Sequence, residues 1–107
     1  MSILPKIEEI ILLAIWKLKD NAFGSLIIQQ VEEDTGSSWV SGSVYSALAR
    51  LKKHGYINTV ERDKVSEGIG RPRVYYELSE SGKEKLLSIQ RVTSKMWKGV
   101  PNLDEGY

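Results

Sequence analysis

The sequence of 107 residues predicts a single α+β domain that is mostly α-helical. Apolar residues recur at helical spacing in four segments. Two short runs rich in β-branched and aromatic residues lie between the third and fourth segments, and a polar loop with two glycines joins them. The expected order is therefore helix, helix, helix, strand, loop, strand, helix. One core can bury most of the apolar side chains of a chain of this length.

The composition excludes several classes of function. The absence of cysteine excludes disulfides, Cys-ligated zinc and thiol catalysis. The one histidine, His54, argues against a metal site or a Ser-His-Asp triad. No apolar run reaches the roughly 18 residues of a membrane span, and the N-terminus does not have the layout of a signal peptide. We expect a cytoplasmic protein that is not an enzyme and needs no cofactor or metal.

The first helix is expected from about Pro5 to Lys19, with Pro5 in its first turn. One apolar stripe is formed by Ile7, Ile11, Ala14, Ile15 and Leu18. Leu12 and Trp16 lie on nearly the opposite side of this helix. Because a helix that is apolar on two sides must bury both, we expect Leu12 and Trp16 to meet another subunit.

Two further helices are expected at about residues 24–34 and 42–54, separated by a break at residues 35–38. Ser41 is the expected N-cap of the third helix, and Gly55 stands where a C-cap glycine belongs. The inward face of the third helix is formed by Val44, Ala47, Leu48 and Leu51.

The outward face of the third helix is small in its first half and basic in its second. It carries Gly42, Ser46, Ala49, Arg50 and Lys53, and Ser43 and Tyr45 lie at its flanks. A recognition helix needs little bulk beside the base edges of DNA and positive charge near the phosphates. The alternative is an ordinary amphipathic helix with a polar exterior.

Two strands are expected at residues 56–62 and 73–78, joined by a long loop. Arg71 and Arg73 flank Pro72 at one side of this loop, and Lys64 lies at the other. Such a hairpin can place its cations along phosphates or in a minor groove. The alternative is an exposed loop with incidental charge, but the hairpin and the helix together are more specific than either.

The basic side chains are concentrated in the middle of the chain. Residues 41–76 hold seven basic and three acidic side chains, a balance of +4. Residues 1–40 have a balance of −3, and residues 77–107 are neutral. A charge block of this kind is either a solvated face or a nucleic-acid footprint, and its place in the fold decides between them.

The last helix is expected from about Ser79 to Lys98, with Ser79 or Ser81 as its N-cap. Its residues Leu86, Ile89, Thr93 and Met96 follow the 3-4-3 spacing of a short coiled contact, with Trp97 beside Met96. We therefore expect a dimerisation helix; the alternative is a helix packed only on its own domain. The expected organisation is a DNA-binding domain at 1–78, a dimerisation helix at 79–98 and a loose tail at 99–107.

Two stretches resemble the PadR family of bacterial transcriptional regulators. Residues 41–57, SGSVYSALARLKKHGYI, are similar to its recognition helix, and residues 70–82, GRPRVYYELSESG, to its wing. The pair Phe23-Gly24 stands where the family often has an aromatic residue before glycine. The resemblance covers about residues 5–98. It departs at Ser43, where the family often has Pro or Gly-Thr, so base contacts at this helix start are not carried over.

The resemblance implies a winged helix-turn-helix fold and a C-terminal dimerisation helix, as in the short subgroup of the family. The expected protein is a dimeric, sequence-specific DNA-binding repressor on a palindromic operator. The expected DNA contacts are Ser41, Ser43, Tyr45, Ser46, Arg50, Lys53, Lys64, Arg71 and Arg73. The expected dimer contacts are Leu12, Trp16, Leu86, Ile89, Met96 and Trp97.

Two alternatives remain within this fold. Short members of the family bind flat aromatic compounds between the first and last helices, so the resemblance also implies a small aromatic effector near Trp16 and Trp97. Simple packing at the interface explains the same residues. A winged helix used only for protein–protein contacts is the other alternative; it would lack the steep salt dependence of DNA binding.

Overall fold

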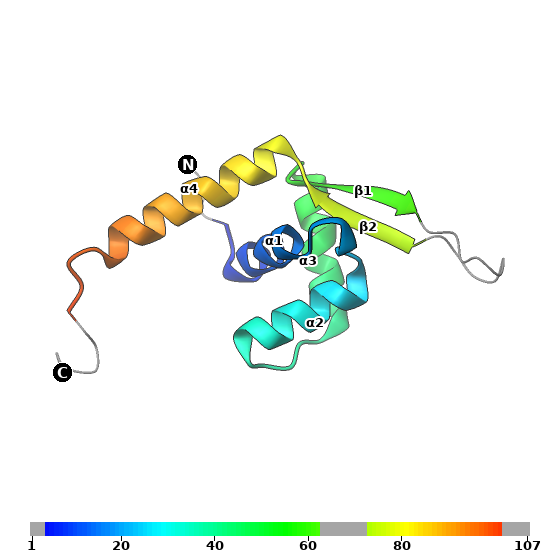
Figure 1. The fold of residues 1–107 in the computed structure, drawn as a ribbon, viewed down its shortest axis with the longest axis horizontal. Coiled ribbons are helices and arrows are strands. Elements are labelled where there is room, and N and C mark those ends of the chain that lie inside the picture. The colour runs from blue at the N-terminus through cyan, green and yellow to red at the C-terminus, as the bar shows by residue number, and fades with distance from the viewer. Residues whose placement is uncertain (1–3, 63–72, 102–107) are drawn as a thin grey trace.

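Three helices, a two-stranded sheet and a projecting fourth helix make up the fold (Figure 1). The structure is a computed structural model that describes residues 4–62 and 73–101. The elements are α1 (Lys6–Leu18), the 3-10 turn η1 (Lys19–Asn21), α2 (Gly24–Thr35), α3 (Ser41–Lys53), β1 (Ile57–Arg62), β2 (Arg73–Leu78) and α4 (Glu80–Trp97). This confirms the predicted order and the mostly helical α+β class.

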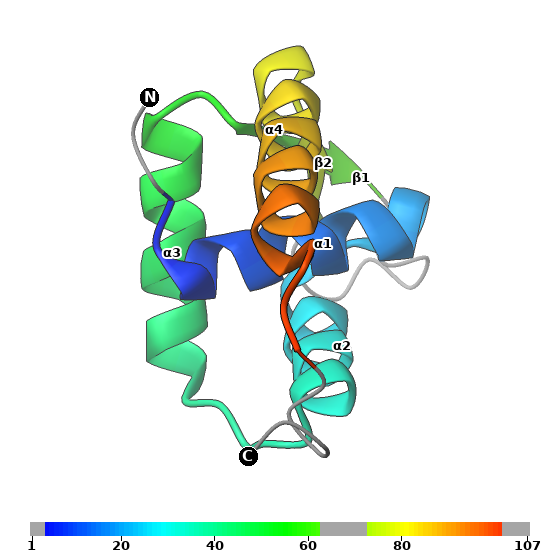
Figure 2. The ribbon, with the colours of Figure 1, turned by 90° about the vertical axis from the view of Figure 1, so that its left-hand side faces the viewer.

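The core lies around α1, which packs against α2, α3, α4 and β2 (Figure 2). Its largest fully buried side chains are Ile11, Leu12, Ile15, Ile27, Leu48, Leu51, Ile57, Val31 and Val44. The prediction that Leu12 faces another subunit is wrong, because this side chain is fully buried within its own protomer. Elements surround α1 on several sides, so most of its circumference is core. Its exposed apolar face is formed by Leu13 and Trp16 instead.

The sheet is an antiparallel hairpin with one additional bridge. Its register runs from Ile57 opposite Leu78 to Arg62 opposite Arg73. Phe23, just before α2, forms an isolated antiparallel bridge with Tyr75. The backbone N–H of Tyr76 donates to the carbonyl of Ala22 at 2.8 Å. The start of α2 is therefore bound to the wing, and both elements are held in place beside α3.

The ends of α3 agree only in part with the prediction. Gly55 follows the helix with φ of +79°, a left-handed conformation that glycine adopts without strain. Ser41 is the first helical residue and not the cap, because Val40 occupies the N-cap position and no side chain caps this end. Helix boundaries read from sequence commonly differ by one residue in this way.

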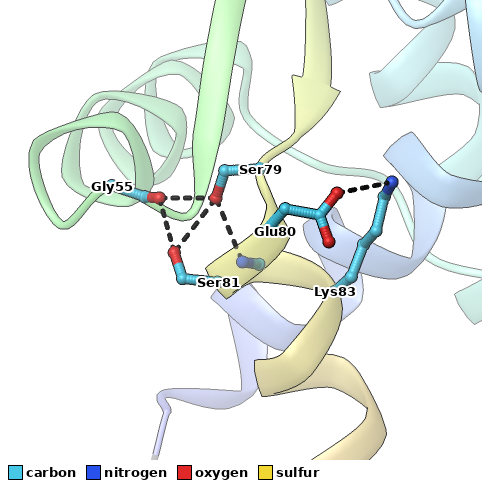
Figure 3. Close-up of polar contacts among 6 residues, drawn as sticks. Gly55, Ser79, Glu80, Ser81 and Lys83 are labelled. Carbon is cyan, nitrogen blue, oxygen red and sulfur yellow. Dashed lines mark hydrogen bonds and ion pairs between the residues drawn. The ribbon is translucent and has the colours of Figure 1, made fainter.

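The start of α4 is attached to the turn that follows α3 (Figure 3). Ser79 is the N-cap, and its hydroxyl accepts from the backbone N–H of Gly82 at 3.1 Å. The hydroxyls of Ser79 and Ser81 both donate to the carbonyl of Gly55, at 2.6 and 2.8 Å. A Cβ at Gly82 would collide with the carbonyl oxygen of Tyr56, so only glycine allows this close approach. Of the two candidates for the cap, Ser79 occupies the position, and Ser81 contacts Gly55 instead.

Candidate nucleic-acid interface

The outward face of α3 is exposed along its whole length. Only Val44, Ala47, Leu48 and Leu51 are buried in this helix, and these are the four residues predicted to face inward. The predicted contact residues Ser41, Ser43, Tyr45, Ser46, Arg50 and Lys53 are all exposed. The last turn contains Arg50, Lys52 and Lys53. The structure therefore presents small side chains in the first half of α3 and positive charge at its end, as a recognition helix requires.

Tyr45 lies on the side of α3 that faces α2 and the wing. Its ring lies over Gly24, the first residue of α2, and a Cβ at that position would overlap the ring and hydroxyl. The glycine of the Phe23-Gly24 pair therefore allows α2 and α3 to approach closely. The side chain of Tyr45 remains 46% exposed, so its outer edge is available to a ligand.

An open hollow separates α3 from the wing. It is lined by Tyr45, Leu48, Ala49, Lys52, Thr59, Glu61, Val74 and Tyr76. Burial, together with the nearby Tyr45, raises the pKa of Tyr76 above its ordinary value of 10.0. Tyr76 is therefore a neutral hydroxyl at physiological pH. The hollow combines the cation of Lys52, the carboxylate of Glu61 and neutral polar groups, and it lies between α3 and the wing, the two elements expected to contact DNA.

The predicted wing cations are only partly within the described residues. Arg73 begins β2, and its guanidinium carbon lies 4.4 Å from the centroid of the Phe23 ring. This cation–π contact holds the arginine at the base of the wing. Lys64 and Arg71, with Gly68, Gly70 and Pro72, lie outside the described residues.

Arg50 has a partner that the sequence analysis did not identify. Its Nε donates to Oε2 of Glu8 at 3.1 Å, which joins α3 to α1. Glu8 is only 4% exposed and is the buried acidic residue of the described core. A signal was available in the sequence, because Glu8 precedes the buried Ile11, Leu12 and Ile15 at helical spacing. An acidic residue in line with an apolar stripe indicates a buried ion pair.

A second surface lies between α1 and α4, away from the outward face of α3. It is a groove of about 490 Å³ whose apolar lining includes Leu13, Trp16, Leu78, Leu86, Leu87 and Ile89. The structure thus brings together three predicted interface residues, Trp16, Leu86 and Ile89. Leu13 and Leu87 were missed, although Leu13 lies on the same helical face as Glu9 and Trp16 and its spacing could have indicated it.

Trp97 does not line this groove within one protomer. It lies at the end of α4 and is 61% exposed, next to Met96, which is 70% exposed. The Trp16 ring does line the groove, and the Nζ atoms of Lys19 and Lys83 lie 3.6 and 5.9 Å from the centroid of that ring. Lys83 and Trp97 are about 20 Å apart along a helix that rises 1.5 Å per residue. Trp16 and Trp97 of one chain therefore do not form a single site.

Among the described residues, no group of three or more His, Cys, Asp or Glu side chains could hold a metal ion. Within the same part of the chain, no helix combines the length and apolar character needed to cross a bilayer.

Residues 12–88 match the family model described as the transcriptional regulator PadR-like family. A PadR family transcription regulator from Clostridium difficile R20291 is similar in structure, with a TM-score of 0.69 and 28% identity over 87% of this chain and 95% of that chain. A PadR-like transcription factor from Bacteroides fragilis superposes with a TM-score of 0.74 and 26% identity, covering 88% of this chain and 85% of the other.

A third structure shows the same fold at lower sequence similarity. It is a PadR-like transcriptional regulator from Bacillus cereus, with a TM-score of 0.74 and 23% identity over 94% of this chain and 93% of that chain. Among curated protein sequences, none matches this chain significantly.

Proposed function

Because this chain belongs to the PadR-like family of transcriptional regulators, we propose that it is a homodimeric, sequence-specific repressor that binds a palindromic DNA operator. In this proposal α3 enters the major groove, and Ser41, Ser43, Tyr45 and Ser46 lie nearest the DNA at its first turns. Lys53, the last residue of α3, contacts a phosphate. Arg73, together with Lys64 and Arg71, binds phosphates or the minor groove from the wing.

The observation that carries the proposal is the exposed face of α3. Its four buried residues all face the core, so its small residues and Lys53 lie on the exposed face, where Arg50 also pairs with Glu8 of α1. Gly24 and Tyr45 hold α2 close to α3, and Phe23 joins α2 to β2. The recognition helix α3 and the wing are thus fixed relative to one another, as simultaneous binding of both to DNA requires.

The groove between α1 and α4 supports the homodimer. Leu87 is 54% exposed there, and Leu13 and Trp16 are 42% and 45% exposed. Apolar side chains gathered in one groove of a small soluble domain mark a contact surface. A two-fold related copy that places its own α4 in this groove covers these residues and also gives Met96 and Trp97 a partner.

The test of DNA binding is a salt series on Lys53→Ala. Each phosphate contact releases counterions, so the variant should bind any duplex more weakly and lose about one unit of salt slope. Lys98→Ala, which removes the same charge beyond the end of α4, is the matched control and should bind as the wild type does. Unchanged affinity and slope in a folded Lys53→Ala protein would contradict the role of α3.

A second candidate function is a regulator that responds to a small aromatic effector. The apolar groove with Trp16 at one end favours it, since such cavities accept flat aromatic compounds. A fluorescent aromatic dye should quench tryptophan emission and lower the affinity for duplex DNA. Full quenching in both Trp16→Phe and Trp97→Ala would place the dye elsewhere and count against this candidate.

A further inference from the structure

The buried carboxylate of Glu8 lies beneath the side of α3. Its side chain is 5% exposed, and the contact it makes across the core is the 3.1 Å hydrogen bond from Nε of Arg50. A carboxylate removed from water requires a hydrogen-bonded partner of opposite charge, so this pair has one preferred arrangement. Glu8 also lies in the first turn of α1, where the helix dipole favours a negative charge. The position of Arg50 is thus set from inside the protein.

Arg50 differs from Glu8 in that its side chain is 49% exposed. The guanidinium group is planar and carries five N–H donors in a rigid fork. Glu8 accepts from Nε, which leaves the two terminal amino groups of the fork to other acceptors. Because the group is rigid, fixing the Nε edge also fixes the direction of the remaining donors.

The exposed part of Arg50 lines a shallow hollow on the α1 side of α3. The hollow is lined by Ile7, Val40, Gly42, Ser43, Ser46 and Arg50. The three polar side chains follow one another at i, i+3 and i+7 on a single side of the helix. Among the described residues that line it, two hydroxyls accompany one guanidinium, and none is acidic. This combination of donors fits a singly charged oxyanion such as a backbone phosphate.

We propose that Glu8 is a positioning residue for DNA binding, which holds the guanidinium of Arg50 so that it binds a backbone phosphate beside α3 together with Ser43 and Ser46. The inference rests on the proposed DNA-binding function and adds a residue that never touches DNA. The contact is independent of base sequence, because it lies at the flank of α3 and addresses the phosphate. It fixes the register of the helix in the groove.

The test is a double-mutant cycle on Glu8→Gln and Arg50→Ala. Binding is measured on a mixed-sequence duplex of about 30 base pairs, which is long enough for both recognition helices of the proposed dimer to contact it one helical turn apart. Arg50→Ala should lower the salt slope by about 0.9. Glu8→Gln should weaken binding on the order of threefold to tenfold, as expected when a charge-assisted hydrogen bond loses its geometry. The double variant should bind no more weakly than Arg50→Ala alone.

A matched control separates positioning from net charge. Glu33→Gln on α2 removes one exposed carboxylate with no contact to Arg50, and by electrostatics alone it should leave affinity unchanged or raise it. A loss of affinity on Glu8→Gln, beside no loss on Glu33→Gln, supports the proposal. An equal gain of DNA affinity in Glu8→Gln and Glu33→Gln would overturn the proposal. Additive losses of affinity in the double variant Glu8→Gln with Arg50→Ala would also overturn it.

Folding and function are checked separately. Arg50→Ala leaves Glu8 buried without its partner, so thermal unfolding is followed for each variant. The double variant contains no unpaired buried charge, so if Arg50→Ala is unfolded, comparing the double variant with Glu8→Gln still measures what Arg50 contributes to binding once Glu8 no longer holds it. If the wild type does not bind duplex DNA, the proposed function fails. If it binds and neither Glu8→Gln nor Arg50→Ala changes the affinity, only the positioning role fails.

Discussion

The three-helix core and α4 differ in how far their apolar side chains are buried. In α1, the residues Ile11, Leu12, Ala14 and Ile15 are at most 2% exposed. In α4, which is described throughout, only Gly82 is buried, while Leu87, Val92, Met96 and Trp97 are all exposed. Figure 1 shows α4 leaving the core after its first turns. The core is complete within one chain, whereas α4 has an apolar surface that one chain does not cover.

The largest effect is expected from truncation in the core. Ile11→Ala removes a fully buried side chain from the centre of α1 and should lower the free energy of unfolding by about 2–5 kcal/mol. Denaturant unfolding measures it. Val40→Ala, at a position 72% exposed between α2 and α3, is the control and should change little. A loss below about 1 kcal/mol for Ile11→Ala would mean that the site collapses around the gap.

The second-largest effect is expected from a substitution on the apolar surface of α4 that one chain does not cover. Ile89→Asp places a charge in the groove between α1 and α4, and should weaken the proposed dimer at least tenfold, about 1.4 kcal/mol. Sedimentation at tens of micromolar should show a dimer for the wild type and a monomer for the variant, both with the same helical circular dichroism.

Arg91→Asp is the matched control for this experiment. Arg91 is exposed and lies on the opposite side of α4 from Ile89, so its replacement should leave the dimer intact. A monomeric wild type under these conditions would contradict the assignment of the groove to a second copy.

The smallest effect is expected at the joint between the two regions. Ser79→Ala removes the N-cap of α4 and one of the two hydroxyl bonds to Gly55, which should cost about 1 kcal/mol. Ser81→Ala removes only a bond to Gly55 and should cost less. Thermal unfolding of the two variants measures the difference, and a larger loss for Ser81→Ala would mean that the Gly55 contact outweighs the cap.

Periodicity and caps predicted most of the fold, because they are local. The inward face of α3, the turn at Gly55 and the cap at Ser79 follow from neighbouring residues. Leu12 was misplaced because its burial depends on how many elements pack around α1, which helical spacing alone does not report. The pair between Glu8 and Arg50 joins residues 42 positions apart, and Trp16 and Trp97 are separated by the length of α4. Such relations depend on tertiary packing.

The attachment of α4 at Gly55 has a consequence for the spacing of an operator. Because the two serine hydroxyls and Gly82 fasten α4 to the turn that ends α3, the direction of α4 is fixed by the recognition helix itself. In the proposed dimer, the length and direction of α4 then set the distance between the two recognition helices. One residue inserted after Lys83, beyond these contacts, rotates the rest of α4 by about 100°. Such an insertion should change the preferred distance between half-sites and leave the base sequence preferred within each half-site unchanged.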